Sequence, residues 1–394
     1  MAKVIVHIDL NAFFVRAEEI RNPFLENKPV AIGHLGRGGV VSTCSYEARK
    51  YGVRSAMPMN KAIKLCPNLI IIPGDYRFYV TMSHEFKNFI RQITPLVESA
   101  SIDELYADFT NVVKGKKNIE AYFRKIQSDL YKETSLKCSI GVGPTKFLAK
   151  MGSDYQKPMG LTIIRRKDIK NILYPLPIED TYGVGKKTAP RLKHIGIKTI
   201  GDLAERLNSN DQDTLNIIGK FSEELKLWVN GYGSDEIITE YDDPKSIGNS
   251  TTLASDTNEF DIIKNTFEIL SEEVSMRAKK ESMIGNTIQI MVKDTEYRPH
   301  NKSITIDHTT NDAKEILNVV LKLYEKNFLD MTLRAVGVTL QNLVNIKDVS
   351  IQMTFFDYEK HEEENKTKLL INDLNRKIKG APLKRASEVK NGHK

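Results

Sequence analysis

Three acidic residues stand where predicted strands end or reverse. Asp9 closes the apolar run VIVHI, and Asp103 with Glu104 separates strand-like stretches at 96–101 and 105–109. Carboxylates at strand ends can hold a hard divalent cation, of which Mg²⁺ and Mn²⁺ are the natural candidates. Consecutive strand residues point to opposite faces, so Asp103 and Glu104 could share one site only if the backbone turns between the two strands. Taken singly, each of the three could equally be a solvated turn residue.

A basic segment could bind phosphate near these carboxylates. The segment SYEARKYGV predicts a short helix on which Tyr46 and Arg49 share a face, so that a phenol and a guanidinium could hold phosphate oxygens. Lys157 lies in SDYQKPMG, where the following proline and glycine predict a rigid turn that could aim its ammonium ion at the same place. On spacing alone, a solvated basic helix face explains the first segment as well.

The elements that must position these residues alternate between strand and helix up to about residue 164. This order predicts an α+β sheet domain whose strands start at the N-terminus and resume after an insertion, with Asn11 as a candidate helix N-cap. Periodicity predicts strands at 3–9, 96–101, 105–109 and 137–142, helices at 75–93, 119–133 and 145–155, and two short strands around a glycine turn within 29–45.

Beyond residue 164 the pattern of the sequence changes twice. Short helices with glycine turns predict a small helical unit up to residue 233, and the polar stretch 234–246 has the composition of a linker. The pattern beyond it predicts a β-α-β-β-α-β unit, and 357–394 lose apolar density, which predicts a mobile tail. The six elements of that unit are expected at 246–253, 259–280, 287–292, 302–307, 312–328 and 335–343.

Composition narrows the class of protein. The 394 residues carry a net charge of +7 and have a pI near 9.0, which favours a polyanionic partner such as nucleic acid. Cys44, Cys66 and Cys138 form no CxxC pair, so neither a disulfide framework nor a zinc site is indicated. Because no apolar run is long enough for a membrane span or a signal peptide, we expect a soluble intracellular protein.

Five motifs in a fixed order carry a resemblance. From residue 1 to about 356 the chain resembles the Y-family translesion DNA polymerases, of the bacterial UmuC/DinB-like or impB/mucB/samB type. The segments that carry it are HIDLNAFFVRAEE (7–19), VVSTCSYEARKYGVRSAMP (40–58), SIDELYADFT (101–110), CSIGVGPTKFLAKMGSDYQKPMG (138–160) and YGVGKKTAPRLKHIGIKTIGDL (182–203).

The resemblance assigns roles to the candidate residues. It implies that Asp9, Asp103 and Glu104 are catalytic and, with the Leu10 carbonyl, hold two Mg²⁺ ions, for which Mn²⁺ could substitute. Phe14 would exclude a ribose 2′-hydroxyl by volume, although on the sequence alone it could be a core residue beside Phe13. The chain departs from the family at Asn11, where a second acidic residue is often found. The residues implied to bind the incoming nucleotide are Phe13, Phe14, Tyr46, Arg49 and Lys157.

The resemblance also implies a right-hand architecture. A palm would comprise 1–10 and 75–165, small fingers 11–74, and a helical thumb with a helix-hairpin-helix 166–233. After the linker, a little finger would span 247–350, and 351–394 would hold a clamp-binding peptide and the mobile tail. Implied DNA contacts are Gly183, Gly185, Lys186, Lys187 and Arg191 in the thumb and Lys293, Arg298, Lys302 and Arg334 in the little finger; these could instead belong to an ordinary helical hairpin and to scattered surface charge.

A short peptide suggests a further partner. Gln352, Met353, Phe355 and Phe356 resemble the motif with which bacterial polymerases dock on the sliding clamp, but the two rings could also pack back on the preceding domain. The implied function is DNA-directed DNA polymerase activity on primer-template DNA and dNTPs, across lesions, with low fidelity and no proofreading. We expect a monomer in the bacterial cytoplasm, associated with the nucleoid and not with a membrane. The alternatives are a non-catalytic DNA-binding accessory subunit of a repair complex and another two-metal palm enzyme.

Overall fold

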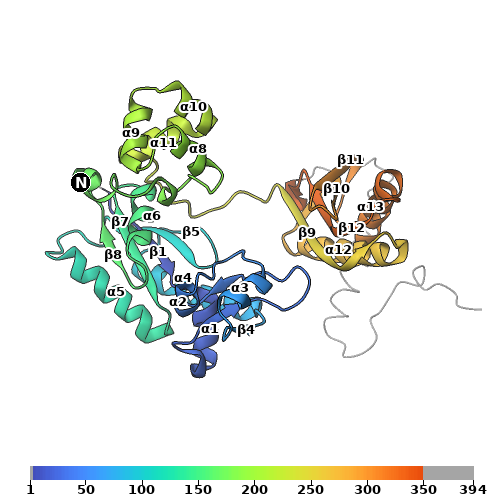
Figure 1. The fold of residues 1–394 in the computed structure, drawn as a ribbon, viewed down its shortest axis with the longest axis horizontal. Helices are drawn as coiled ribbons and strands as arrows, with labels where there is room; N and C mark the ends of the chain where they lie inside the picture. Colours follow the sequence, from blue (N-terminus) through green and yellow to red (C-terminus); the bar gives the residue numbers. More distant parts are fainter. Residues whose placement is uncertain (1–2, 349–394) are drawn as a thin grey trace, which may run out of the picture. The chain divides into compact units, whose positions relative to one another are not determined.

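The computed structural model describes residues 3–348 and divides the chain into two compact units, 1–242 and 243–394 (Figure 1). We call these the first and second units. No helix within the described part of the chain is long and apolar enough to cross a membrane. The predicted clamp peptide, 352–356, lies outside the described residues.

The first unit is built on a five-stranded sheet. Its central strand, β1, is buried along its whole length, because both faces are covered by helices. The predicted strands are confirmed, and the sheet has a further edge strand, β8, that was not predicted because its three residues show no alternation. The strand order is β5 (Val97–Ser99), β6 (Glu104–Asp108), β1 (Ile5–Leu10), β7 (Cys138–Gly143) and β8 (Leu161–Ile163), antiparallel except for β7 and β8.

Two long helices, α4 (Tyr76–Ile93) and α5 (Ile119–Thr134), cover one face of this sheet. The apolar residues of that face form one core: Val6, Ile8, Leu10, Phe86, Ile90 and Phe123. The predicted helix at 145–155 is confirmed as α6 (Lys146–Tyr155), which begins at a Thr145 cap and lies on the opposite face. Strand alternation therefore places Ile5, His7 and Asp9 beneath α6.

Close packing of α6 depends on glycine. A Cβ atom added at Gly141 of β7 would lie 1.9 Å from the Ala149 carbonyl oxygen of α6, far inside van der Waals contact. A Cβ atom added at Gly152 on the helix would lie 3.1 Å from the Gly141 Cα, which is also a tight contact. The two glycines let backbone approach backbone, and this brings the polar side chains of α6 down to Asp9.

The insertion at 11–74 forms a small layer of its own. As predicted, two short strands occur within 29–45, and the sheet order is β3 (Thr43–Cys44), β2 (Val30–Ile32) and β4 (Ile70–Ile72). Asn11 was wrongly predicted to be a helix N-cap: the cap position is Ala12, in the left-handed region at φ 47°, and no side chain caps the helix. The helices of the insertion are α1 (Phe13–Arg21), α2 (Tyr46–Lys50) and α3 (Met59–Leu65).

A helical bundle follows β8, as predicted. Its core packs against the side of α6 that faces away from the sheet, through Phe147, Leu148 and Met151. The predicted linker is less free than its composition suggests, because Ile238 N–H donates to Glu98 at 2.7 Å and the Tyr241 hydroxyl donates to the Ser99 carbonyl at 2.7 Å. The bundle contains α7 (Ile169–Ile172), α8 (Thr188–His194), α9 (Ile200–Asn208), α10 (Gln212–Ile218) and α11 (Ser222–Val229).

The second unit confirms the predicted β-α-β-β-α-β order. Its antiparallel sheet runs β11-β10-β12-β9, with a short β13 (Val344–Asn345) beside β10. Both helices contribute to a core on one face of the sheet. The six elements are β9 (Ser246–Thr257), α12 (Phe260–Lys280), β10 (Met283–Asp294), β11 (Pro299–Thr310), α13 (Ala313–Phe328) and β12 (Leu333–Gln341).

The three cysteines are all buried free thiols of the first unit. Burial raises the pKa of the Cys44 and Cys66 thiols, and it raises that of Cys138 to about 12. This agrees with the absence of a disulfide framework expected from their spacing.

The close approach of β7 and α6 predicts that Gly141 tolerates no side chain. Gly141→Ala should lower the free energy of unfolding of the first unit by about 3 kcal/mol, because backbone must move to admit the methyl group. Gly185→Ala is the matched control: its new Cβ would meet nothing within 4 Å, so stability should change by less than about 1 kcal/mol. Urea denaturation measures both, and equal stability of the two variants would contradict the packing argument.

Candidate active site

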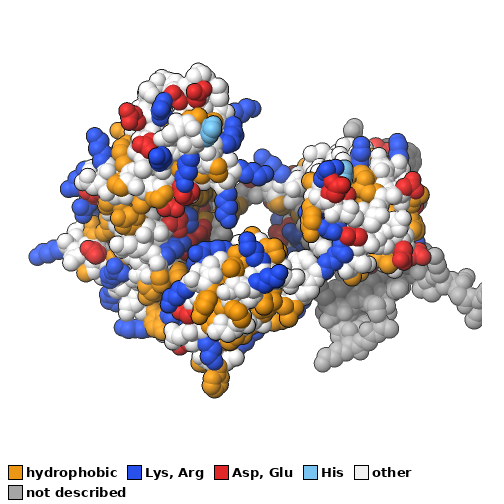
Figure 2. All heavy atoms as spheres, viewed as in Figure 1, with side chains coloured by type: hydrophobic (Ala, Val, Ile, Leu, Met, Phe, Trp, Pro, Cys, Tyr) orange, Lys and Arg blue, Asp and Glu red, His pale blue; other side chains and the backbone are white. Residues whose placement is uncertain are grey.

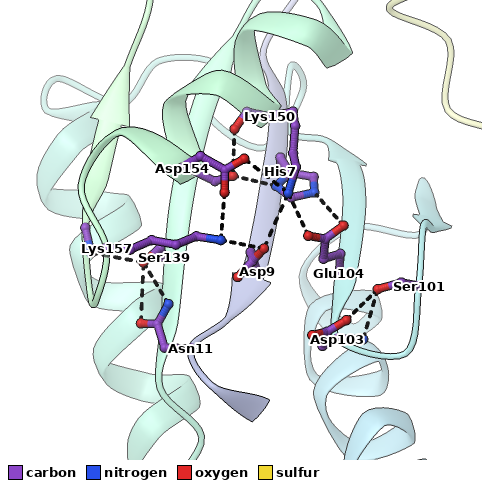
Figure 3. A network of polar contacts seen from close by, with 12 residues as sticks. His7, Asp9, Asn11, Ser101, Asp103, Glu104, Ser139, Lys150, Asp154 and Lys157 are labelled. Atoms are coloured by element: carbon purple, nitrogen blue, oxygen red, sulfur yellow. Dashed lines mark hydrogen bonds and ion pairs between the residues drawn. The ribbon is translucent and has the colours of Figure 1, made fainter. Parts of the chain in front are cut away.

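Strand register places two of the predicted carboxylates opposite each other. Asp9 of β1 pairs with Glu104 of β6, so both side chains lie on the face beneath α6 (Figure 3). The backbone between β5 and β6 turns as the sequence required: Asp103 is held at 2.6 Å from the Ser101 hydroxyl, and its carbonyl accepts from Leu10 N–H at 3.0 Å. Asp103 therefore lies beside β1 without following the strand alternation of Glu104.

Lys150 of α6 is a buried ammonium among these carboxylates. Its Nζ lies 2.6 Å from Glu104, 3.4 Å from Asp9 and 3.3 Å from Asp154 (Figure 3). Burial alone would lower the pKa of Lys150, but the three carboxylates outweigh it and raise that pKa above its ordinary value. Sequence analysis missed this residue, because a lysine four positions before an aspartate on a helix has the pattern of a solvated ion pair.

Lys157 supplies a second positive charge. It was predicted to meet the triphosphate, and its Nζ lies 2.7 Å from Asp9 and 2.7 Å from Asp154. The turn that carries it passes through a cis Lys157–Pro158 bond. Both lysines therefore bridge Asp9 and Asp154, the second of which was also missed in the sequence.

The carboxylates differ in their affinity for protons. Burial raises the pKa of Asp9 to about 7, and the neighbouring Glu104 adds to the rise. Burial would raise the pKa of Glu104 as well, but contacts with His7, Asp9 and Lys150 bring it below its ordinary value. The imidazole Nδ1 of His7 is 2.7 Å from the Ser153 hydroxyl, while its buried Nε2 lies 3.7 Å from Glu104 and has no hydrogen-bond partner.

A cavity of about 260 Å³ opens beside Asp9. It collects all five residues predicted to bind the nucleotide, together with two of the three predicted catalytic carboxylates. The Arg49 guanidinium lies over the Tyr46 ring, 4.6 Å from its centroid, which confirms that these side chains share a face. The lining residues are Asp9, Leu10, Ala12, Phe13, Phe14, Ser42, Thr43, Tyr46, Arg49, Ser55, Asp103 and Lys157; of these, Thr43 and Ser55 were not singled out in the sequence.

The two adjacent phenylalanines have different surroundings. Phe13 is 2% exposed and belongs to the core of the sheet. Phe14 is half-buried, and its ring stacks on Tyr79 with centroids 4.4 Å apart. The Tyr79 hydroxyl donates to Glu18 at 2.8 Å, which fixes the ring beneath Phe14. Phe14 is thus a supported ring in the cavity wall.

The donor set fits divalent cations in charge and chemistry. Asp9, Asp103 and Glu104 supply hard oxygen donors, and two ammonium ions already lie within hydrogen-bond reach of them, so the site attracts positive charge. As they stand, no three His, Cys, Asp or Glu side chains within residues 3–348 lie close enough together to hold a metal ion. A cation bound there would take its remaining oxygen ligands from a backbone carbonyl, a phosphate or water.

The predicted DNA contacts are divided between the two units. Lys186, Lys187 and Arg191 are exposed around the start of α8, and Figure 2 shows Lys and Arg side chains on the visible face of both units. In the second unit, Arg334 forms two hydrogen bonds with Asp256, at 3.1 and 2.8 Å, and Arg298 pairs with Glu296. Two of the four basic residues predicted there thus already have an acidic partner.

Three family models match the chain. Residues 8–154 match the impB/mucB/samB family, 166–197 match the IMS family HHH motif, and 244–354 match the impB/mucB/samB family C-terminal domain. DNA polymerase IV of Bacillus velezensis is 35% identical, with 99% of this chain and 95% of that protein covered. DNA polymerase IV 1 of Bacillus subtilis is 35% identical, with 99% and 96% covered.

Solved structures agree. The Y-family DNA polymerase chimera Dbh-Dpo4(243-245)-Dbh has a TM-score of 0.75 and 28% identity, and DinB from Sulfolobus solfataricus has a TM-score of 0.58 and 28% identity; each comparison covers 87% of this chain and 99% of the other. Fold and site together define a polymerase of the nucleotidyltransferase class. The chain belongs to the impB/mucB/samB family of Y-family DNA polymerases.

Because Lys150 lies among the carboxylates, we expect a variant without this lysine to be stabilised by divalent cations. Lys150→Met should cost about 4 kcal/mol, because it leaves buried carboxylates without their main counter-charge. Added Mg²⁺ should restore part of that loss and raise the melting temperature of the variant more than that of the unchanged protein.

The matched control is Lys146→Met on the same helix. Lys146 forms a similarly buried pair with Glu98 at 2.5 Å but contacts none of the predicted catalytic carboxylates. This variant should lose stability without an increased response to Mg²⁺ in a thermal melt. An equal Mg²⁺ response in both variants would refute the role given to Lys150.

Proposed function

We propose that this Y-family polymerase extends primers across damaged template by two-metal phosphoryl transfer centred on Asp9, Asp103 and Glu104. The observation that carries the proposal is the register of β1 and β6. It sets Asp9 opposite Glu104, and Asp9 lines a cavity whose wall also includes the Arg49 guanidinium, the Tyr46 phenol and the Lys157 ammonium ion. The family match argues against both alternatives, a non-catalytic accessory subunit and a different palm enzyme.

A Y-family polymerase requires divalent metal, and we propose Mg²⁺, with Mn²⁺ as a substitute. The three carboxylates and the Leu10 carbonyl would hold two ions. Bound ions of this kind lower the pKa of the primer 3′-hydroxyl and neutralise the triphosphate and the leaving pyrophosphate.

Three side chains of the cavity are suited to the triphosphate. Arg49 offers paired N–H donors, and its packing on the Tyr46 ring limits the directions in which they can point. Burial raises the pKa of Tyr46, so its hydroxyl stays protonated and can donate to a phosphate oxygen. Lys157 adds a positive charge on the side of Asp9.

The subdomain assignment and the partners are also proposals. The five-stranded sheet supports a palm at 1–10 and 75–165, with fingers at 11–74, a thumb at 166–233 and a little finger at 247–350. The helix-hairpin-helix motif match and the exposed basic residues near α8 support sequence-independent contacts with DNA phosphates. We further propose that a monomer acts at the nucleoid in the cytoplasm and that 352–356 dock on the sliding clamp.

Loss of one carboxylate charge should abolish catalysis. Asp103→Asn should reduce Mg²⁺-dependent insertion of one nucleotide on the order of 1,000-fold, because a misplaced metal no longer stabilises the transition state. Binding of primer-template, measured by fluorescence anisotropy, should be retained. Asp108→Asn, at the other end of β6, is the control and should insert nucleotides normally; near-normal insertion by Asp103→Asn would sink the assignment.

The cavity wall predicts how the sugar is selected. Phe14→Ala should raise insertion of ribonucleotides relative to deoxynucleotides by about tenfold or more, since the supported ring would no longer fill the space beneath the sugar. Phe123→Ala is the matched control: Phe123 is buried in the core of the same sheet and does not line the cavity, so the change should lower the melting temperature and leave the selectivity unchanged. A ratio of kcat/KM values that is the same in Phe14→Ala and the unchanged protein would show that Phe14 only stabilises the fold.

A further inference from the structure

Asn11 is a buried amide with a specific set of partners. Its side chain is 4% exposed at the end of β1. Its Nδ2 donates to the Ser139 hydroxyl at 2.9 Å, and its Oδ1 accepts from the Met159 N–H at 2.7 Å (Figure 3). The side chain therefore links β1, β7 and the turn after α6, and a helix-capping role does not account for it.

The turn held by Asn11 is tightly constrained. Met159 adopts φ 57°, in the left-handed region that a side chain disfavours, and it is kept there by surrounding contacts. A Cβ atom at Gly160 would lie 1.6 Å from the Gln156 carbonyl oxygen, so the chain folds back closely on itself. Gly160 N–H also donates to the Ser139 hydroxyl, at 3.3 Å. Asn11 and Ser139 thus fix two consecutive backbone amides of this turn.

Lys157 lies at the start of the same turn. Its ammonium ion is 2.7 Å from Asp9 and 2.7 Å from Asp154, and it forms part of the cavity wall. A lysine side chain has four rotatable bonds, so the position of its ammonium group also depends on how firmly its backbone is held. The hydrogen bond from the Met159 N–H to the Asn11 side chain, two residues further along, provides that constraint; we call this contact the anchor.

We propose that Asn11 is a positioning residue, which locks the 157–160 turn and so holds the Lys157 ammonium ion where the triphosphate of the incoming nucleotide is bound. This inference rests on the proposed function. A carboxylate at position 11 could accept from the same Met159 N–H and from the Ser139 hydroxyl, so it would keep the anchor. The neutral amide makes two bonds here without adding negative charge beside Asp9.

Single-nucleotide insertion kinetics test the proposal. Asn11→Ala should raise the KM for dNTP about tenfold, the factor expected for loss of buried hydrogen bonds, while kcat changes less than about threefold. Asn11→Asp should restore KM to within about twofold of the original value. Asn311→Ala, which removes a hydrogen bond to the Met283 carbonyl in the second unit, should lower the stability of that unit and leave KM unchanged. An unchanged KM in Asn11→Ala with a lowered melting temperature would overturn the proposal.

Hydrogen exchange of the full chain without substrates gives a second readout. Amides of the 156–161 segment should exchange about tenfold faster in Asn11→Ala but not in Asn11→Asp, and unchanged exchange in the alanine variant would refute the anchor. If the unchanged protein extends no primer, the proposed function is wrong, but the exchange result still tests whether Asn11 holds the 157–160 turn. If Asn11→Ala does not fold, Ser139→Ala carries both measurements with the same expected directions.

Discussion

Buried carboxylates need positive charge within reach, and this requirement organises the face of the first sheet that lies beneath α6. Asp9 and Glu104 face each other across paired strands, an arrangement that is repulsive when both are ionised. Lys150 and Lys157 offset the repulsion from one side of the sheet only, because both belong to the helix and turn that follow β7. The proposed site is therefore held together by electrostatics as well as by the backbone.

Much of the surrounding structure serves to bring that helix close enough. The Thr145 cap sets where α6 begins, and Gly141 removes the side chain that would hold the helix away from β7. The side of α6 that faces away from the sheet packs into the helical bundle, so the helix is fixed from both directions. A shift of α6 by even 1 Å would break the short contact between Lys150 and Glu104.

The sequence predicted helices and strands well where burial imposes a regular spacing of apolar residues. It predicted them poorly where contacts with distant parts of the chain determine the structure. The other four strands of the first sheet, α4, α5 and the six main elements of the second unit followed from apolar spacing, whereas β8 is too short to show a period. At the site, motif order identified the cavity residues, but Lys150 and Asp154 have the pattern of a surface ion pair unless the close approach of α6 is known. Asn11 was misassigned for the same reason, since its partners lie 128 and 148 residues away.

The three buried thiols make this protein convenient for spectroscopy. A cysteine reacts as the thiolate, and burial raises the thiol pKa of Cys44, Cys66 and Cys138. These three thiols should therefore not react with maleimide reagents at neutral pH. All three lie in the first unit. One cysteine introduced on an exposed surface of each unit would thus accept dyes or spin labels selectively, without prior removal of the native thiols. Distances between such a pair, measured with and without primer-template DNA, would report how the two units are placed relative to each other.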